Sequence, residues 1–566
     1  MLKVAAVFGA LLVIASGELL KNGGFETLDG WACWSNLHCE LSSDGHSGSH
    51  AFKVSNRPRW NTGPQQDIHP TPGHLYRAGA WVKLLGEGSD GFGERIQLEV
   101  AFHYTDGRTS YNAAAERYGV HTSDGWVYLE GDFSVPNASL EWTRVYFQGP
   151  KAGLEFMVDD TSITELLLPG TGSWRHTTRS AIDAIRKSGI NIRVTTADHI
   201  DKNQVDIQVV QKTRPFPFGT AVACSAYNTK SRGNYRDFIH KHFNWAVTEN
   251  ALKWKVIEST QGQRHYQQAL DCVRGLRSNN IKVRGHNLVW SVPVNVQGWQ
   301  KALSGDILRR TVKNHITDVM NVTRRLLEHW DVNNENLHGT WYQDRLHDPD
   351  YDLELFRIAH AQDSHVKLFL NDFSVVAQGA STYAYLNQTI RFKAANVGLY
   401  GIGVQCHFPD EMEPNPDIIR HRLDILAQAG VPIWVTELDV MSKDDNRRAD
   451  FYEMALSALF SHPAVEGIML WGFWDKFSWR GEAGALVKGD HLELTAAGRR
   501  VFDLLENQWM TDETYVLSQT SDHFTLRGFH GDYEVRVHYQ GKELGNLTQT
   551  FTLGDDEQDV TVHMHT

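Results

Sequence analysis

Two stretches of the sequence decide the fold: Trp330-Asp331-Val332-Asn333-Asn334-Glu335 and Trp434-Val435-Thr436-Glu437-Leu438-Asp439. Each is a short apolar run that ends in a glutamate, and similar runs alternate with helical sequence between residues 218 and 507. The eight runs cover residues 219–222, 245–247, 283–286, 329–332, 367–370, 401–404, 433–435 and 468–471. This alternation predicts an α/β domain with the architecture of a (β/α)8 TIM barrel. Because the C-terminal strand ends of such a barrel meet at one mouth, we expect Glu335 and Glu437 to face each other there.

Separate modules are expected on either side of the barrel, which we place at residues 216–510. Residues 18–168 alternate short β-type runs with Gly, Asp, Asn and Pro turns, which predicts an N-terminal β-sandwich. Residues 169–215 are interpreted as a linker and bridging segment, with a helix at 179–187 and strands near 190–194 and 205–211. Residues 511–566 predict a small C-terminal β-domain. A chain of 566 residues is too long for one ordinary core, so several domains are expected.

Composition limits the partners of this chain. Its formal net charge is −13, so nucleic acid and anionic membrane surfaces would be repelled by its mean field. The chain also contains 18 tryptophans, whose flat faces suit neutral planar ligands such as sugar rings. No CxxC or HExxH spacing occurs, and we expect neither a metal nor another cofactor. A neutral partner is therefore expected, and the tryptophan faces would suit sugar rings or bases.

The N-terminus and the cysteines indicate the compartment. Residues 1–17 have the pattern of a secretory signal peptide, so we expect a secreted, extracellular and soluble protein, and a monomer. Cys33 and Cys39 are close enough to form a disulfide, whereas Cys224, Cys272 and Cys406 include one odd thiol, and sequence leaves their pairing open. Four asparagines lie in glycosylation motifs: Asn137, Asn321, Asn387 and Asn546.

The pair of glutamates points to a specific chemistry. Cleavage of a glycosidic bond needs one carboxylic acid to protonate the leaving oxygen and one ionised carboxylate to meet the oxocarbenium-like centre. Taken alone, either glutamate would more often be a surface carboxylate or a strand-end ion pair. Together at one barrel mouth, Glu335 and Glu437 predict a glycoside hydrolase.

A family resemblance makes this prediction more specific. Six motifs occur in order: TENALKW at 248–254, RGHNLVW at 284–290, WDVNNE at 330–335, GIGVQCH at 401–407, VTELD at 435–439 and WGFWDK at 471–476. Through them the chain resembles glycoside hydrolase family 10, the endo-β-1,4-xylanase family, over roughly residues 216–510. The resemblance implies that Glu335 is the general acid/base and Glu437 the nucleophile of a retaining double displacement. The two carboxyl groups of such enzymes lie about 5–5.5 Å apart.

The resemblance also implies roles for the surrounding residues. Asn334 should contact the substrate 2-OH, Gln405 should assist the acid/base, and His407, oriented by Asp439, should contact Glu437. The remaining substrate-binding residues are Glu249, Asn250, Lys253 and His286 on the glycone side, with Trp290, Trp471 and Trp479 as aromatic floor and roof. Taken singly, these residues could be a helix-surface ion pair between Glu249 and Lys253, a structural His407, and core tryptophans.

Three positions depart from the family pattern. They are Ser291, where a second histidine is common, Asn333 in place of valine, and Cys406 in place of a small residue. None removes a group from the proton or nucleophile chemistry, but Ser291 and Asn333 leave subsite strength and the surroundings of the acid/base open.

The N-terminal module resembles carbohydrate-binding modules of families 4, 9 and 22. The resemblance rests on LKNGGF at 20–25, GHSGSH at 45–50, NRPRW at 56–60 and FMVDDTSI at 156–163. It implies Trp60 as a sugar-binding platform and Tyr111 as a second contact, with a core tryptophan as the alternative for Trp60. The expected protein is thus a modular endo-β-1,4-xylanase. A β-1,4-glucanase with mixed xylan and cellulose activity, and a catalytically inactive polysaccharide-binding protein, remain alternatives.

Overall fold

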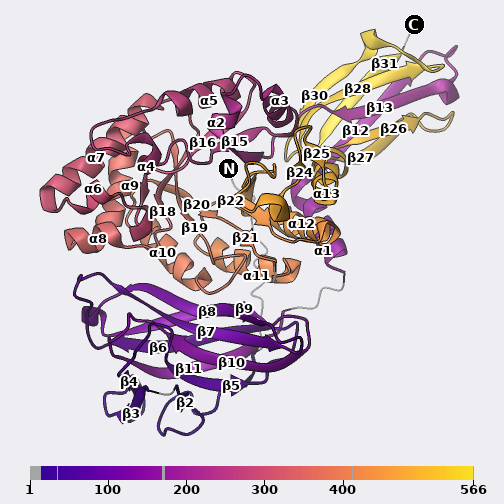
Figure 1. The fold of residues 1–566 in the computed structure, drawn as a ribbon. Coiled ribbons are helices and arrows are strands. Elements are labelled where there is room, and N and C mark those ends of the chain that lie inside the picture. The colour runs from indigo at the N-terminus through magenta and orange to yellow at the C-terminus, as the bar shows by residue number, and fades with distance from the viewer. Residues whose placement is uncertain (1–14, 35, 169–172, 411, 565–566) are drawn as a thin grey trace.

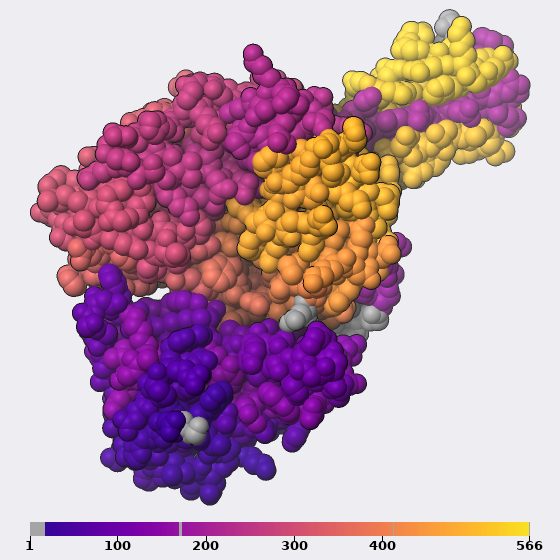
Figure 2. All heavy atoms as spheres, in the orientation of Figure 1, coloured from indigo at the N-terminus to yellow at the C-terminus, as the bar shows by residue number. Residues whose placement is uncertain are grey.

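The computed structural model describes residues 15–34, 36–168, 173–410 and 412–564, which form three bodies (Figure 1). A β-sandwich packs against one side of a large α/β barrel, and a second, smaller β-sandwich projects from the barrel at another side (Figure 2). Most of the predicted signal peptide and residues 169–172, the start of the predicted linker and bridging segment, lie outside the described residues. Among the described residues, no helix combines the length and apolar character needed to cross a membrane.

The central domain is a closed barrel of eight parallel strands. They are β14 (Phe218–Val222), β15 (Trp245–Thr248), β16 (Lys282–Gly285), β18 (His329–Asn334), β19 (Lys367–Asp372), β20 (Leu399–Val404), β22 (Ile433–Val440) and β23 (Val465–Leu470). Neighbours pair in this order, β23 pairs with β14, and pairing of β16 with β18 closes the ring. The predicted (β/α)8 architecture is confirmed.

Helices surround the barrel and explain why its strands are continuous apolar runs. The longer ones are α3 (Gly233–His242), α5 (Gln267–Arg277), α7 (Gly305–Val322), α9 (Tyr351–Gln362), α10 (Thr382–Ala394), α11 (Pro416–Ala427), α12 (Asp445–Phe460) and α13 (Ala496–Asp503). Strands of a parallel barrel are covered by helices on one face and by the barrel interior on the other, so both faces are apolar. All eight residues of β22 are accordingly buried.

Several of the tryptophans fill the barrel interior. Trp245 and Trp434 pack against each other with ring centroids 4.8 Å apart and ring planes tilted by 58°, inside a buried cluster that also contains Phe369. Gly467 makes room for this packing, because a Cβ at that position would lie 2.5 Å from the ring of Trp434. Part of the tryptophan excess is therefore structural rather than ligand-binding.

The N-terminal module is a sandwich of two antiparallel sheets. One contains β1 (Ala15–Glu18), β3 (His38–Ser42), β4 (Ala51–Ser55), β6 (Leu75–Leu84), β9 (Trp126–Ser134) and β11 (Phe156–Leu166). The other contains β2 (Ala32–Cys33), β5 (Pro64–Ile68), β7 (Glu94–Tyr104), β8 (Thr109–Val120) and β10 (Leu140–Gln148). A disulfide joins Cys33 and Cys39, which confirms that prediction. A second disulfide, in the barrel, joins Cys224 and Cys272, and Cys406 is a buried free thiol.

The C-terminal β-domain differs from the expected division of the chain, because it is built from two distant segments. After helix α1 (Trp174–Arg186), the supposed bridging segment supplies one strand to each of its two sheets. One sheet contains β12 (Lys187–Thr196), β27 (His523–Phe529) and β31 (Gln558–Met564). The other contains β13 (Val205–Gln211), β26 (Asp512–Val516), β28 (Gly531–Tyr539), β29 (Lys542–Glu543) and β30 (Gln549–Leu553). The apolar side chains of β12 and β13 are buried only by pairing with strands that follow some 300 residues later in the chain.

Polar and charged contacts hold the outer domains to the barrel. The Arg422 guanidinium on α11 donates from Nε to Asp132 Oδ1 of the N-terminal module at 2.9 Å, and both residues are buried. Near the C-terminal domain, Arg186 donates to the carbonyl oxygens of Phe460, His462 and Val465 at 3.1, 3.1 and 2.8 Å. Since these contacts satisfy buried charged groups, we expect each domain to hold a defined position.

Candidate active site

The structure brings the two predicted glutamates together at the C-terminal ends of the barrel strands. Glu335 follows β18, where its carboxylate accepts hydrogen bonds from Trp290 Nε1 at 2.7 Å and Gln405 Nε2 at 3.3 Å. Glu437 lies in β22 and is 5% exposed. Asn371, at the end of β19, connects the two strands, because its Nδ2 donates both to Asn334 Oδ1 at 2.9 Å and to Glu437 Oε1 at 2.8 Å.

The surroundings of the two carboxyl groups move their pKa values apart. Burial, together with the negative charges of Asp372 and Glu437, raises the pKa of Glu335 to about 7. Burial would also raise the pKa of Glu437, but a hydrogen bond from His407 and nearby positive charge, including that of Lys253, lower it to about 2. One carboxyl group can therefore hold a proton near neutral pH while its neighbour stays ionised, which is the division that acid and nucleophile require.

The imidazole ring of His407 lies between the carboxylates of Glu437 and Asp439 and stabilises the ionised form of Glu437. His407 Nε2 lies 3.3 Å from Glu437 Oε2, and its Nδ1 lies 2.7 Å from Asp439 Oδ2. Burial would lower the pKa of His407, but these two carboxylates raise it to about 9, so the ring is charged and donates to both. Asp439 accepts two further hydrogen bonds, from Trp479 Nε1 at 2.7 Å and from Arg480 Nε at 3.2 Å.

The predicted glycone-side residues also gather at this mouth. Lys253 is 8% exposed, donates from Nζ to Asn250 Oδ1 at 2.9 Å, and lies over the rings of Trp290 and Trp471 at 5.1 and 5.8 Å from their centroids. His286 meets Trp471 edge-on, with ring centroids 5.3 Å apart.

Two further residues of the predicted set border this group. Burial raises the pKa of Glu249, the neighbour of Asn250 in the chain. Trp479 remains 57% exposed, so one of its ring faces is available to a ligand. The mouth thus presents aromatic faces and polar edges, which is the combination that sugar rings need.

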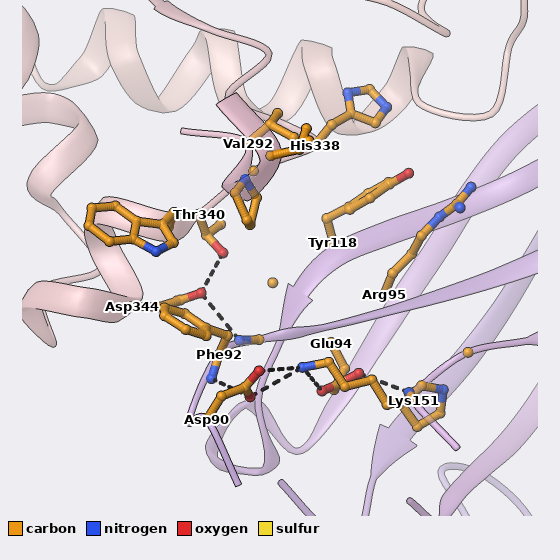
Figure 3. Close-up of a pocket in the computed structure, with 18 of the residues that line it drawn as sticks. Asp90, Phe92, Glu94, Arg95, Tyr118, Lys151, Val292, His338, Thr340 and Asp344 are labelled. Carbon is orange, nitrogen blue, oxygen red and sulfur yellow. Dashed lines mark hydrogen bonds and ion pairs between the residues drawn. The ribbon is translucent and has the colours of Figure 1, made fainter. Parts of the chain in front are cut away.

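The two residues predicted for the N-terminal module differ in their surroundings. Trp60 and Tyr111 are 55% and 60% exposed. Trp60 lines a cavity of about 660 Å³ between the module and the barrel, which Figure 3 shows, whereas Tyr111 does not line it. The structure therefore does not join Trp60 and Tyr111 in one site, and their sugar-binding roles stay predictions.

Sequence reasoning missed several residues of the site. Asn371 and Asp372 continue β19 beyond the predicted run, Asp331 accepts a 2.9 Å hydrogen bond from His286 Nδ1, and Arg480 holds Asp439. The signal for Asn371 was present, because it is a polar residue at a barrel strand end, as Asn334 and the two glutamates are. Asp331 and Arg480 act through other side chains, and only the tertiary contacts show this.

Two departures from the family pattern contact each other. Ser291 Oγ donates to Asn333 Oδ1 at 2.8 Å, and Asn333 Nδ2 donates to Asn336 Oδ1 at 2.6 Å. All three residues are buried, so each polar group that replaces a more usual residue has a partner. Ser291, directly after β17 (Val289–Trp290), and Asn333 in β18 thus form a hydrogen-bonded pair.

A TIM barrel with this carboxylate pair at its mouth defines the class of glycoside hydrolases. A family model described as glycosyl hydrolase family 10 matches residues 206–499, and one described as a carbohydrate binding domain matches residues 17–153. The chain therefore belongs to glycosyl hydrolase family 10 and carries an N-terminal carbohydrate-binding domain, as the resemblance predicted.

Similar proteins have related names. Endo-1,4-beta-xylanase 1 of Arabidopsis thaliana is 35% identical over 73% of this chain and 42% of its own length. Endo-1,4-beta-xylanase 2 of the same plant is 31% identical over 93% of this chain and 49% of its own length. The chain thus spans about half the length of these two relatives. Among solved structures, xylanase 10B from Thermotoga petrophila in complex with xylobiose is 25% identical, with a TM-score of 0.48, and covers 52% of this chain and 94% of its own.

Proposed function

We propose that this protein is a secreted endo-β-1,4-xylanase that hydrolyses xylan by a retaining double displacement. The observation that carries the proposal is the pair of carboxyl groups at the barrel mouth. Glu335, beside Trp290 and Gln405, has its pKa raised to about 7, and Glu437, beside His407, has its pKa lowered to about 2. The names of the two plant relatives support xylan as the substrate class.

The first displacement uses both glutamates. The Glu437 carboxylate attacks the anomeric carbon and forms a glycosyl ester, while Glu335 transfers its proton to the glycosidic oxygen, so the leaving sugar departs as a neutral alcohol. His407 keeps Glu437 ionised, and Asn371 fixes the nucleophile relative to Asn334. In this proposal the Asn334 amide hydrogen-bonds the substrate 2-OH.

The second displacement returns the enzyme to its starting state. Glu335, now ionised, takes a proton from water, and the resulting hydroxide attacks the anomeric carbon and releases Glu437. Two inversions at one carbon give net retention. The N-terminal carbohydrate-binding domain would raise the local concentration of polysaccharide without taking part in bond cleavage.

Several observations support the proposal of secretion. The disulfides Cys33–Cys39 and Cys224–Cys272 are typical of oxidising compartments. The asparagine of every predicted glycosylation motif is exposed, and these are Asn137, Asn321, Asn387 and Asn546. Mass spectrometry of the mature protein from a eukaryotic host tests both cleavage near Gly17 and glycan attachment.

The substitution Glu437→Ala tests the catalytic assignment. We expect it to abolish release of reducing sugar from xylan, while the protein still sediments with insoluble xylan, because the nucleophile is lost and the binding surfaces remain. Glu493→Ala, at an exposed glutamate of β25 (Glu493–Leu494), is the matched control and should retain full turnover. Undiminished turnover in Glu437→Ala would contradict the assignment.

Substrate preference is decided by comparing product release from xylan, carboxymethylcellulose and glucomannan. Release from xylan alone supports a xylanase, and comparable release from carboxymethylcellulose supports the mixed-activity alternative. Binding to these polymers without product from any of them would support the inactive binding protein.

A further inference from the structure

A carboxylate of the N-terminal domain reaches into the barrel beside the catalytic mouth. Glu116 on β8 is 4% exposed, and Arg95 of the same domain donates to its Oε2 at 2.7 Å. Its other oxygen faces the barrel, where Ser381 Oγ donates to it at 2.9 Å and His338 Nε2 lies 3.4 Å away. Figure 3 shows His338, Arg95 and Tyr118 converging where the two domains meet. Ser381 and His338 of the barrel thus contact Glu116 across the interface between the two domains.

His338 connects Glu116 to a carboxylate of the barrel. Its Nδ1 lies 2.5 Å from Asp372 Oδ1, and its ring stacks on Phe373 with centroids 3.7 Å apart. Burial would lower the pKa of His338, but the carboxylates of Asp372 and Glu116 raise it to about 10. Each end of a buried imidazolium thus meets a carboxylate, one from each domain, and with Arg95 the four formal charges cancel.

Asp372 in turn anchors the loop that carries the acid/base. Its Oδ2 accepts from Leu337 N at 2.8 Å, and Glu335 N donates to Asn371 O at 2.8 Å. His338 N closes the turn by donating to Glu335 O at 3.0 Å. Glu335 has a φ of 56°, a left-handed conformation that is strained for a residue with a side chain and persists only where the surroundings enforce it.

We propose that Glu116 is a positioning residue for the acid/base Glu335, acting through His338 and Asp372. The inference rests on the proposed function and deepens it, because the carbohydrate-binding domain then supplies part of the support for bond cleavage. The other groups that face Glu335 are Trp290, Gln405, Glu437 and Lys253, all from the barrel.

A second interdomain ion pair offers a matched control. Arg422 donates to Asp132 of the N-terminal domain and also to the carbonyl oxygens of Val376 and Ala377 at 2.8 and 2.9 Å. This pair is buried like Glu116 and His338, but none of its hydrogen bonds reaches the turn from Glu335 to His338. We therefore expect Asp132→Asn to remove one interdomain ion pair while the contacts of Glu116 with His338 and Ser381 stay in place.

Two substrates with different leaving groups can distinguish a misplaced acid from a general loss of catalytic activity. Cleavage of an unactivated xylo-oligosaccharide needs proton donation to the leaving oxygen, whereas a dinitrophenyl β-xylobioside departs as a stable anion without it. Because kcat/KM reports steps up to the first irreversible one, it isolates this displacement for both substrates. We expect Glu116→Gln to lower kcat/KM about 10-fold on xylohexaose and less than 2-fold on the dinitrophenyl substrate.

The controls make each outcome decisive. Asp132→Asn should leave the ratio of the two kcat/KM values unchanged. If Glu116→Gln does not fold, Glu116→Asp keeps the charge but withdraws the carboxylate, and the same selective loss is expected at a smaller size. Equal losses on both substrates, no loss, or the same selectivity in Asp132→Asn would overturn the inference. If the unsubstituted protein hydrolyses neither substrate, the proposed function fails instead.

Discussion

The hydrogen bond from Trp290 to Glu335 should set the upper pH limit of activity. Trp290 Nε1 donates to Glu335 Oε2 at 2.7 Å, which favours the ionised carboxylate and holds the pKa below the value that burial alone would give. Under the proposed mechanism Glu335 must be protonated for the first displacement, so we expect activity to fall as the pH rises through its pKa of about 7. Trp290→Phe keeps an aromatic ring in place but removes the donor.

The size and sign of the change in the Glu335 pKa follow from the loss of this hydrogen-bond donor. A hydrogen bond to a charged group contributes about 1.5–3 kcal/mol, and 1.36 kcal/mol corresponds to one pH unit. Since Gln405 still donates and water can enter, we expect the lower end, about one pH unit. Because the ionised form loses stabilisation, the basic limb of kcat/KM should move to higher pH.

The assay is the pH profile of kcat/KM on xylohexaose. Trp479→Phe is the matched control, because it removes an equally short indole hydrogen bond, at 2.7 Å, from Asp439 rather than from Glu335. Its basic limb should stay in place. A basic limb that is unchanged or moves downward in Trp290→Phe would refute this account of how the Glu335 pKa is set.

Three further predictions concern stability and stereochemistry. Asp331→Asn should lower the free energy of unfolding by about 3–5 kcal/mol in urea titrations, because it leaves the fully buried Arg284 without its partner, whereas Asp67→Asn in an exposed pair should cost less than about 1 kcal/mol. Replacing Cys224 and Cys272 together by serine should cost about 2–4 kcal/mol, and an unchanged midpoint would show that this bond contributes nothing. Proton NMR during xylan hydrolysis should show the β-anomer first, and early α-anomer would exclude retention.

The barrel could be predicted from local sequence because each of its strands has its own signal, an apolar run within a short segment. Each barrel strand is an apolar run because it is covered on both of its faces. The observed bounds of each strand agree closely with the predicted run. The polar residues that end β18 and β22 were predictable for the same reason, since strand ends converge by topology.

Contacts between distant segments escaped prediction. The strands β12 and β13 could be recognised as strands, but their partners follow some 300 residues later, and pairing over that distance leaves no periodic signal. Asp331, Arg480 and Asp372 act through the residues they hold, so nothing in their local sequence distinguishes them from ordinary charged residues.

The sequence by itself determined the barrel, its two glutamates and the class of chemistry, because hydrophobic periodicity and strand-end position are properties of short segments. The resemblance already implied that Glu335 is the acid/base and Glu437 the nucleophile. Only the tertiary structure supplied the physical reason, because burial and neighbouring charges move the pKa values of these two carboxyl groups in opposite directions. It also brought Glu116 of a separate domain within 3.4 Å of His338 Nε2, a contact that exists only where the two domains pack together.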